Sequence, residues 1–135
     1  MEQEQIIQLQ MIEQESNQLN QQMQMIEQSI DEMKKLKLSL ESLENQKEGE
    51  ILVDIGKKIY LTVNTKNKNL IVEVGKGNLV EKNISDTKKI VDEQVEKLMV
   101  ARVNIEGRMN ELQEEMMKMV QIIEQSQKKE SKEKN

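Results

Sequence analysis

The chain of 135 residues has the length of a single domain, a third of its residues are charged, and it contains no Phe, Trp, Cys, His or Pro. This composition suits long amphipathic helices better than a compact globule, and it excludes disulfides and thiolate metal sites. The net charge of -5, with Lys and Glu mixed along the chain, argues against nucleic acid as a partner, because nucleic acid requires a clustered basic face.

Residues 1–48 are predicted to form a long helix of a coiled coil. Ten positions recur at alternating intervals of three and four residues, and eight of them are apolar: Leu9, Ile12, Ser16, Leu19, Met23, Ile26, Ile30, Met33, Lys37 and Leu40. Such a narrow repeat is the seam of a coiled coil rather than the wider stripe of a globular helix. Leu36, Leu40 and Leu43 indicate a phase slip near the end of this helix. We expect Gly49 to cap it in a left-handed conformation, with Lys47 in the last turn.

Residues 49–84 have the chemistry of strands and turns. Apolar residues alternate with polar ones, and Gly56, the segment 66–69 and the segment 75–77 separate the runs, which predicts two consecutive β-hairpins. A lone hairpin is marginally stable in water and its free edges invite pairing. We therefore predict an oligomerisation module that closes a sheet or β-barrel between subunits. Its apolar residues are Ile51, Val53, Ile55, Ile59, Leu61, Val63, Leu70, Val72, Val74, Leu79 and Val80.

Residues 85–127 are predicted to form the second coiled-coil helix. Nine of the ten positions in its seam are apolar: Val91, Val95, Leu98, Arg102, Ile105, Met109, Leu112, Met116, Met119 and Ile123. Ser85 is the expected N-cap, with Asp86 at the positive end of the helix dipole. Residues 128–135 lack apolar side chains and are expected to be a disordered charged tail.

The two predicted helices match in length and are joined by a short insert, so we expect an α+β domain in which they pair antiparallel as a coiled-coil hairpin. Both chain ends then lie at one tip, where extra apolar residues appear beside the seam: Ile6, Ile7, Met11, Met117, Val120 and Ile122. An exposed apolar patch marks an interaction site, and methionine suits a promiscuous one. If the helices part there, Leu9, Ile12, Met116, Met119 and Ile123 join that surface. Helix pairing or fraying is the alternative role for the residues beside the seam.

Catalytic chemistry is not expected. Without His or Cys, the usual general base and thiolate nucleophile are missing. Gly75-Lys76-Gly77 lacks the rest of a phosphate-binding loop and is interpreted as a β-turn. Glu114 and Glu115 are interpreted as the solvated flank of a coiled coil rather than as metal ligands. The N-terminus does not resemble a signal peptide and the apolar runs are too short to span a bilayer, so no membrane partner is expected.

Residues 50–84, with the segments EILVDIG, IYLTV and LIVEVGKGNLVEKNI, resemble the two-hairpin region of α-class prefoldin subunits. The most specific part is Val74-Gly75-Lys76-Gly77 followed by Val80-Glu81-Lys82. The resemblance implies a hetero-hexamer of two α-type and four β-type subunits, in which the hairpins also contact the second α subunit.

It further implies a cytoplasmic, ATP-independent chaperone, or holdase, without a cofactor. Such a chaperone captures unfolded clients at its coiled-coil tips and delivers them to a group II chaperonin. The alternative is a homo-oligomeric or filamentous prefoldin-like scaffold.

Overall fold

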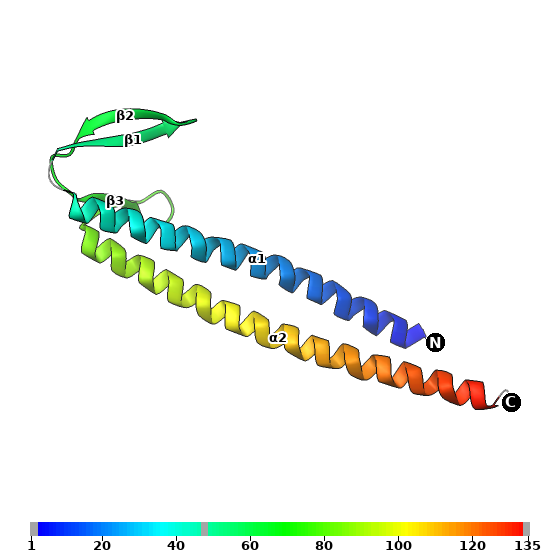
Figure 1. Ribbon diagram of the computed structural model, residues 1–135. Helices are drawn as coiled ribbons and strands as arrows, with labels where there is room; N and C mark the ends of the chain where they lie inside the picture. Colours follow the sequence, from blue (N-terminus) through cyan, green and yellow to red (C-terminus); the bar gives the residue numbers. More distant parts are fainter. Residues whose placement is uncertain (1–2, 47–48, 134–135) are drawn as a thin grey trace. The chain divides into compact units, whose positions relative to one another are not determined.

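A computed structural model of the chain describes residues 3–46 and 49–133. Its elements, in chain order, are α1 (Gln3–Asn45), β1 (Glu50–Gly56), β2 (Ile59–Asn64), β3 (Leu70–Glu73), β4 (Leu79–Lys82) and α2 (Ile84–Glu133) (Figure 1). The chain divides into two compact units: one combines residues up to Ile30 with those from Lys97 onward, and the other spans Asp31–Glu96. The predicted fold, two long helices with two β-hairpins between them, is confirmed.

The predicted seams are where the helices meet. All ten seam positions of α1, from Leu9 to Leu40, are buried or half-buried, and so are nine of the ten in α2. The exception is Met116, which is 36% exposed. Leu112 is the most deeply buried side chain, at 1% exposure. The repeat of apolar residues at alternating intervals of three and four residues therefore identified the faces by which the helices pair, because only one narrow stripe of each helix can face its neighbour.

In the unit Asp31–Glu96, Leu40, Ile84 and Val91 form a buried core, and Leu70 of β3 packs against it together with Met33, Leu43 and Val95. This contact ties β3 to the helices of the same unit. The polar seam residue Lys37 pairs with Asp92 across the helices, Nζ to Oδ1 at 2.8 Å.

The predicted phase slip at Leu36 is wrong. Leu36 is 43% exposed, whereas the seam continues through Lys37 to Leu40. The aliphatic stem of a lysine can cover an apolar seam while its ammonium group reaches a carboxylate at the edge. Here that carboxylate is Asp92, so the seam keeps its phase with a lysine in an apolar position.

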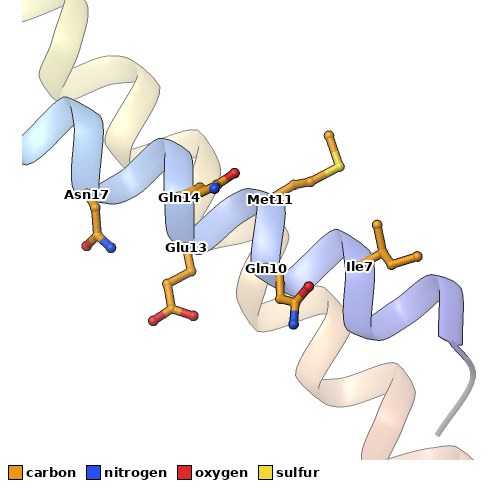
Figure 2. A pocket seen from close by; sticks show the side chains of 6 residues that line it. All are labelled: Ile7, Gln10, Met11, Glu13, Gln14 and Asn17. Carbon is orange, nitrogen blue, oxygen red and sulfur yellow. The ribbon is translucent and has the colours of Figure 1, made fainter.

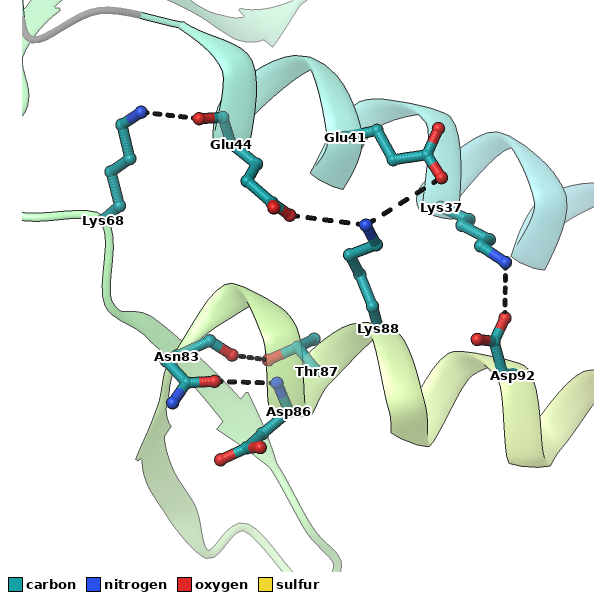
Figure 3. A network of polar contacts seen from close by, with 9 residues as sticks. All are labelled: Lys37, Glu41, Glu44, Lys68, Asn83, Asp86, Thr87, Lys88 and Asp92. Carbon is teal, nitrogen blue, oxygen red and sulfur yellow. Dashed lines mark hydrogen bonds and ion pairs between the residues drawn. The ribbon is translucent and has the colours of Figure 1, made fainter.

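The end of α1 is capped by a residue distant in sequence. Lys68, in the loop between β2 and β3, donates from Nζ to the carbonyl oxygens of Glu44, at 2.9 Å, and Gln46 (Figure 3). Gly49 has a φ of +153°, far from the roughly +57° of a left-handed cap, so the predicted glycine cap is wrong. Lys47 lies outside the described residues. The carbonyls that a helix end leaves without partners thus receive the ammonium of Lys68 instead.

The start of α2 is also capped differently from the prediction. The side-chain oxygen of Asn83 accepts a hydrogen bond from the backbone N–H of Asp86 at 2.7 Å, and its carbonyl accepts from the backbone and hydroxyl of Thr87 (Figure 3). Asn83 is therefore the N-cap, and Ser85 lies inside the helix. Asp86 does occupy the first turn, where its charge complements the helix dipole.

The far end of α2 differs from its prediction as well. Residues 128–133 continue the helix, although we expected a disordered tail from residue 128 to residue 135. Five of the six residues 128–133 are Lys or Glu, which are strong helix formers, and neither Gly nor Pro interrupts this segment. Lys132 in the last turn also interacts favourably with the negative end of the helix dipole. Helix propensity therefore outweighs the absence of packing there.

The insert forms two antiparallel hairpins, β1 with β2 and β3 with β4, as predicted. Two corrections concern single residues. Ile55 has no partner in the ladder, because a β-bulge shifts the register between Asp54 and Gly56. Val74 lies one residue past the end of β3, and its N–H closes the following turn by donating to the carbonyl of Asn78 at 2.9 Å.

Candidate interaction surfaces

The hairpins leave most of their apolar side chains exposed. A two-stranded sheet has two faces and no second layer, so it cannot bury them within one chain. Seven of the eleven residues predicted for oligomerisation are exposed, while Ile51, Val63, Leu70 and Val72 are half-buried. Leu52, Tyr60 and Ile71, which were not predicted, are exposed as well. We call all ten exposed apolar residues of the insert the hairpin surface: Leu52, Val53, Ile55, Ile59, Tyr60, Leu61, Ile71, Val74, Leu79 and Val80.

Both faces of the β1–β2 hairpin contribute to this surface. Val53 lies opposite Leu61 in the ladder, and Leu52 and Tyr60 lie at the intervening positions, which point to the other face. The alternation used for the prediction omits Leu52, Tyr60 and Ile71, because it follows one face of each strand. Counting apolar residues on both faces would have found them. A hairpin that is apolar on both sides needs covering from both sides.

The second apolar surface lies at the tip, which we define as residues 3–15 of α1 and 108–124 of α2. Three of the eleven predicted tip residues, Leu9, Met119 and Ile123, are half-buried in the seam. Ile12 is only 8% exposed, so the helices are paired at this position and Ile12 does not join the exposed surface. The other seven are exposed: Ile6, Ile7, Met11, Met116, Met117, Val120 and Ile122. These seven keep between 36% and 64% of their surface exposed, and client contact stays a prediction for them.

Ile7 and Met11 are neighbouring exposed apolar residues on one side of α1. They are one helical turn apart, and Figure 2 shows both side chains projecting from the same side of the helix, away from Gln10 and Glu13. Together with Gln10, Glu13, Gln14 and Asn17 they line a shallow hollow of about 350 Å³. The tip therefore presents apolar side chains on its outer surface as well as at the seam.

A second hollow of about 380 Å³ lies over the seam of the tip. It is lined by Gln8, Met11, Ile12, Glu15, Glu115 and Met119, which come from both helices. Ile12 is its most deeply buried lining residue, while Met11 is 64% exposed. The two helices thus form a groove in which thioether and aliphatic groups meet carboxylates.

A charged cluster joins the two helices beside this groove. Arg108 donates from Nε to Oε1 of Glu15 at 2.7 Å and from Nη2 to Oε2 at 3.1 Å, which is a two-point pairing across the helices. Its Nη1 also reaches Glu111 at 3.0 Å and Glu115 at 3.8 Å. The hydrogen bonds from Arg108 hold the pKa of Glu15 below its ordinary value. In return, the carboxylate of Glu15, together with those of Glu111 and Glu115, raises the pKa of Arg108. No local pattern predicted this pair, because its members are 93 residues apart.

Elsewhere along the helices, exposed apolar residues are fewer, although Val100 and Val103 line one small hollow together with Met99. Met25, Leu36, Leu38, Val100 and Val103 are the cases away from the tip and the hairpins. Scattered residues of this kind are common on protein surfaces. The tip and the hairpin surface differ from them because more exposed apolar residues gather there, seven at the tip and ten on the hairpins.

The described residues show no sign of a metal or membrane site. No group of three or more acidic side chains within residues 3–46 and 49–133 is placed to hold a metal ion. Within those same ranges, neither helix contains a stretch long and apolar enough to cross a membrane.

Comparison with known proteins agrees with this architecture. The family model described as Prefoldin subunit matches residues 12–129, which include most of both helices and the entire insert. A cryo-EM structure of filamentous PFD from Methanocaldococcus jannaschii has the same fold, with a TM-score of 0.73, 19% sequence identity, and coverage of 83% of this chain and 94% of that one. No curated protein matches the chain. Because the family model spans most of the sequence, the chain belongs to the prefoldin family, whose members are non-enzymatic chaperones.

Proposed function

We propose that the chain is an α-class prefoldin subunit that acts as an ATP-independent holdase, with the tip holding non-native proteins and the hairpin surface joining subunits. The observation that carries this proposal is the position of the exposed apolar residues, which gather at the tip and on the hairpins. Two complete hairpins, β1–β2 and β3–β4, support the α class, since the β class has one.

Holding a non-native chain requires weak and adaptable contacts rather than a rigid pocket. Met11, Met116 and Met117 are exposed at the tip, and their unbranched, polarizable side chains adjust to irregular apolar partners. Several tips in one assembly raise the effective concentration of binding sites for a client that touches more than one. The client is stabilised by mass action, so no bond-breaking step is needed.

The partners follow from this role. The hairpin surface would pair with the hairpins of β-type subunits and of a second α subunit, in a hexamer of two α and four β chains. Clients are unfolded proteins in the cytoplasm, and a group II chaperonin receives them. Burial of apolar side chains such as Leu61 and Ile59, both more than half exposed in the single chain, would drive the assembly.

The tip is tested by removing its exposed apolar groups. In the assembled particle, Ile6, Ile7, Met117, Val120 and Ile122 are replaced together by Gln, and the suppression of aggregation of a denatured client is measured by light scattering. The control replaces Met25, Val100 and Val103, which are more exposed than the five tip residues but lie away from the tip. We expect the tip variant to lose most of its protection and the control to keep it. Unchanged protection by the tip variant would rule out the tip as the client-holding surface.

Assembly is tested on the hairpins. Leu61→Asp places a charge on the exposed face of β2, and Asn64→Asp, at the end of the same strand, is the matched control. We expect Leu61→Asp to dissociate the particle, measured by native mass spectrometry, while the helical circular dichroism signal is retained. A particle that survives this change would contradict the assembly role of the hairpin surface.

A homo-oligomeric or filamentous scaffold is the second candidate function. The similarity in fold to a filamentous PFD favours considering it. The purified chain alone discriminates between the two. A large, stable multimer of this one chain would support the scaffold, whereas small species that complete only with a β-type partner would support the hetero-hexamer.

A further inference from the structure

The charges around the tip are strongly one-sided. The sequence has no Lys or Arg before Lys34, although seven acidic residues precede that position. In the tip part of α2, residues 108–124, four glutamates accompany two cations, Arg108 and Lys118. The apolar side chains of the tip are therefore set in an acidic surrounding, which a purely hydrophobic contact surface does not require.

The groove over the seam brings these two features together. Ile12 forms its floor, Met11 and Met119 flank it, and the carboxylates of Glu15 and Glu115 stand at its edge. The groove is therefore amphipathic, with an apolar base and an acidic margin. An occupant that matched it would carry an apolar side chain and a cation next to each other.

The acidic margin is not neutralised by the arginine beside it. The guanidinium of Arg108 contacts three carboxylates, those of Glu15, Glu111 and Glu115, which leaves a formal charge of -2 on the four groups. Glu15 takes two short hydrogen bonds, whereas Glu115 is 3.8 Å from Arg108 and its side chain is 52% exposed. Of the two carboxylates that line the groove, Glu115 is thus the more available to an incoming cation.

We propose that this groove selects, among non-native segments, those in which Lys or Arg stands beside an apolar residue. The inference rests on the proposed holdase function and specifies its clients. The apolar side chain enters between Met11 and Met119, and the neighbouring cation meets Glu115. A segment with Asp or Glu beside the apolar residue places a second negative charge next to the carboxylate of Glu115, and its binding is disfavoured.

The lysines at the end of α2 do not reverse this preference. Lys128 is nine residues beyond Met119 in the same helix, which corresponds to about 14 Å along the axis. That separation exceeds the screening length of roughly 8 Å at physiological ionic strength. Lys118, next to Met119 in sequence, is nearer, but the carboxylates of Glu111, Glu114 and Glu115 outnumber it. The field at the groove is therefore set by these carboxylates.

Two labelled peptides test the selection. They share one apolar core of Leu and Val, flanked on both sides by Lys in the first and by Glu in the second, and their binding to the assembled particle is measured by fluorescence anisotropy. We expect the Lys-flanked peptide to bind roughly five- to tenfold more tightly at low salt, with the ratio shrinking towards one at high salt. Glu115→Gln should reduce the ratio by about half or more, and the matched control Glu114→Gln, which lies outside the groove, should leave it unchanged.

Each outcome separates this inference from the proposed function. Equal binding of both peptides would overturn the selection but keep the holdase. Equal effects of Glu115→Gln and Glu114→Gln would overturn the groove as its source. Binding of neither peptide would overturn the holdase proposal and the selection with it. Dissociation of the particle by Glu115→Gln would show that a second copy of the chain fills the groove, which also overturns the selection.

Discussion

Replacement of Leu112 by Ala should lower the free energy of unfolding more than the same replacement of an exposed leucine. Leu112 is 1% exposed, so the change removes three buried carbon groups at about 0.8 kcal/mol each, or about 2.4 kcal/mol. The gap left behind adds to this loss, although two paired helices can relax more easily than a thick core. We therefore expect the free energy of unfolding to fall by about 3 kcal/mol.

The assay is urea unfolding followed by far-ultraviolet circular dichroism, at one fixed protein concentration because assembly also contributes to stability. For a slope of about 2 kcal/mol per molar urea, the midpoint should fall by roughly 1.5 M with the slope unchanged. The control is Leu38→Ala, the same chemical change at a position that is 65% exposed, with an expected loss under about 1 kcal/mol. Equal losses in the two variants would refute the assignment of Leu112 to a buried seam.

Three further changes test the polar contacts. Because Arg108 lowers the pKa of Glu15, the stability that ionised Glu15 contributes is present above pH 4.5 and is lost as the pH falls through the lowered pKa. The difference in unfolding free energy between the unaltered chain and Glu15→Gln, measured by urea unfolding, should therefore shrink in acid. A difference that stays constant with pH would show that it does not come from the ionised carboxylate of Glu15. Asn83→Ala should cost about 1 kcal/mol of unfolding free energy, and Asn83→Ser should restore it, unless Asn83 is not the N-cap. Lys68→Met keeps the aliphatic stem but donates no hydrogen bond, so hydrogen exchange of the amides in the last turn of α1 should accelerate; unchanged exchange would show that Lys68 does not cap α1.

The sequence by itself determined the two seams and the two hairpins. A seam needs only one stripe of apolar residues at the helical period, and that stripe is visible along the chain, as from Leu9 to Leu40. The hairpins follow from alternation and turn residues that lie within a few positions of one another, such as the turn 75–77. Both signals are local, so no knowledge of distant neighbours was required.

Tertiary structure alone decided the caps, which of the predicted tip residues are exposed, and the charged cluster beside them. Lys68 reaches the end of α1, and Arg108 reaches Glu15, only because pairing of the helices brings together segments that are far apart in sequence. The same pairing places Ile12 inside and Met116 partly outside, although both occupy seam positions. The physical reason is that the partners of a long side chain or an apolar face depend on the register and rotation of the opposite helix. Neither quantity can be determined from the local residue pattern of one helix.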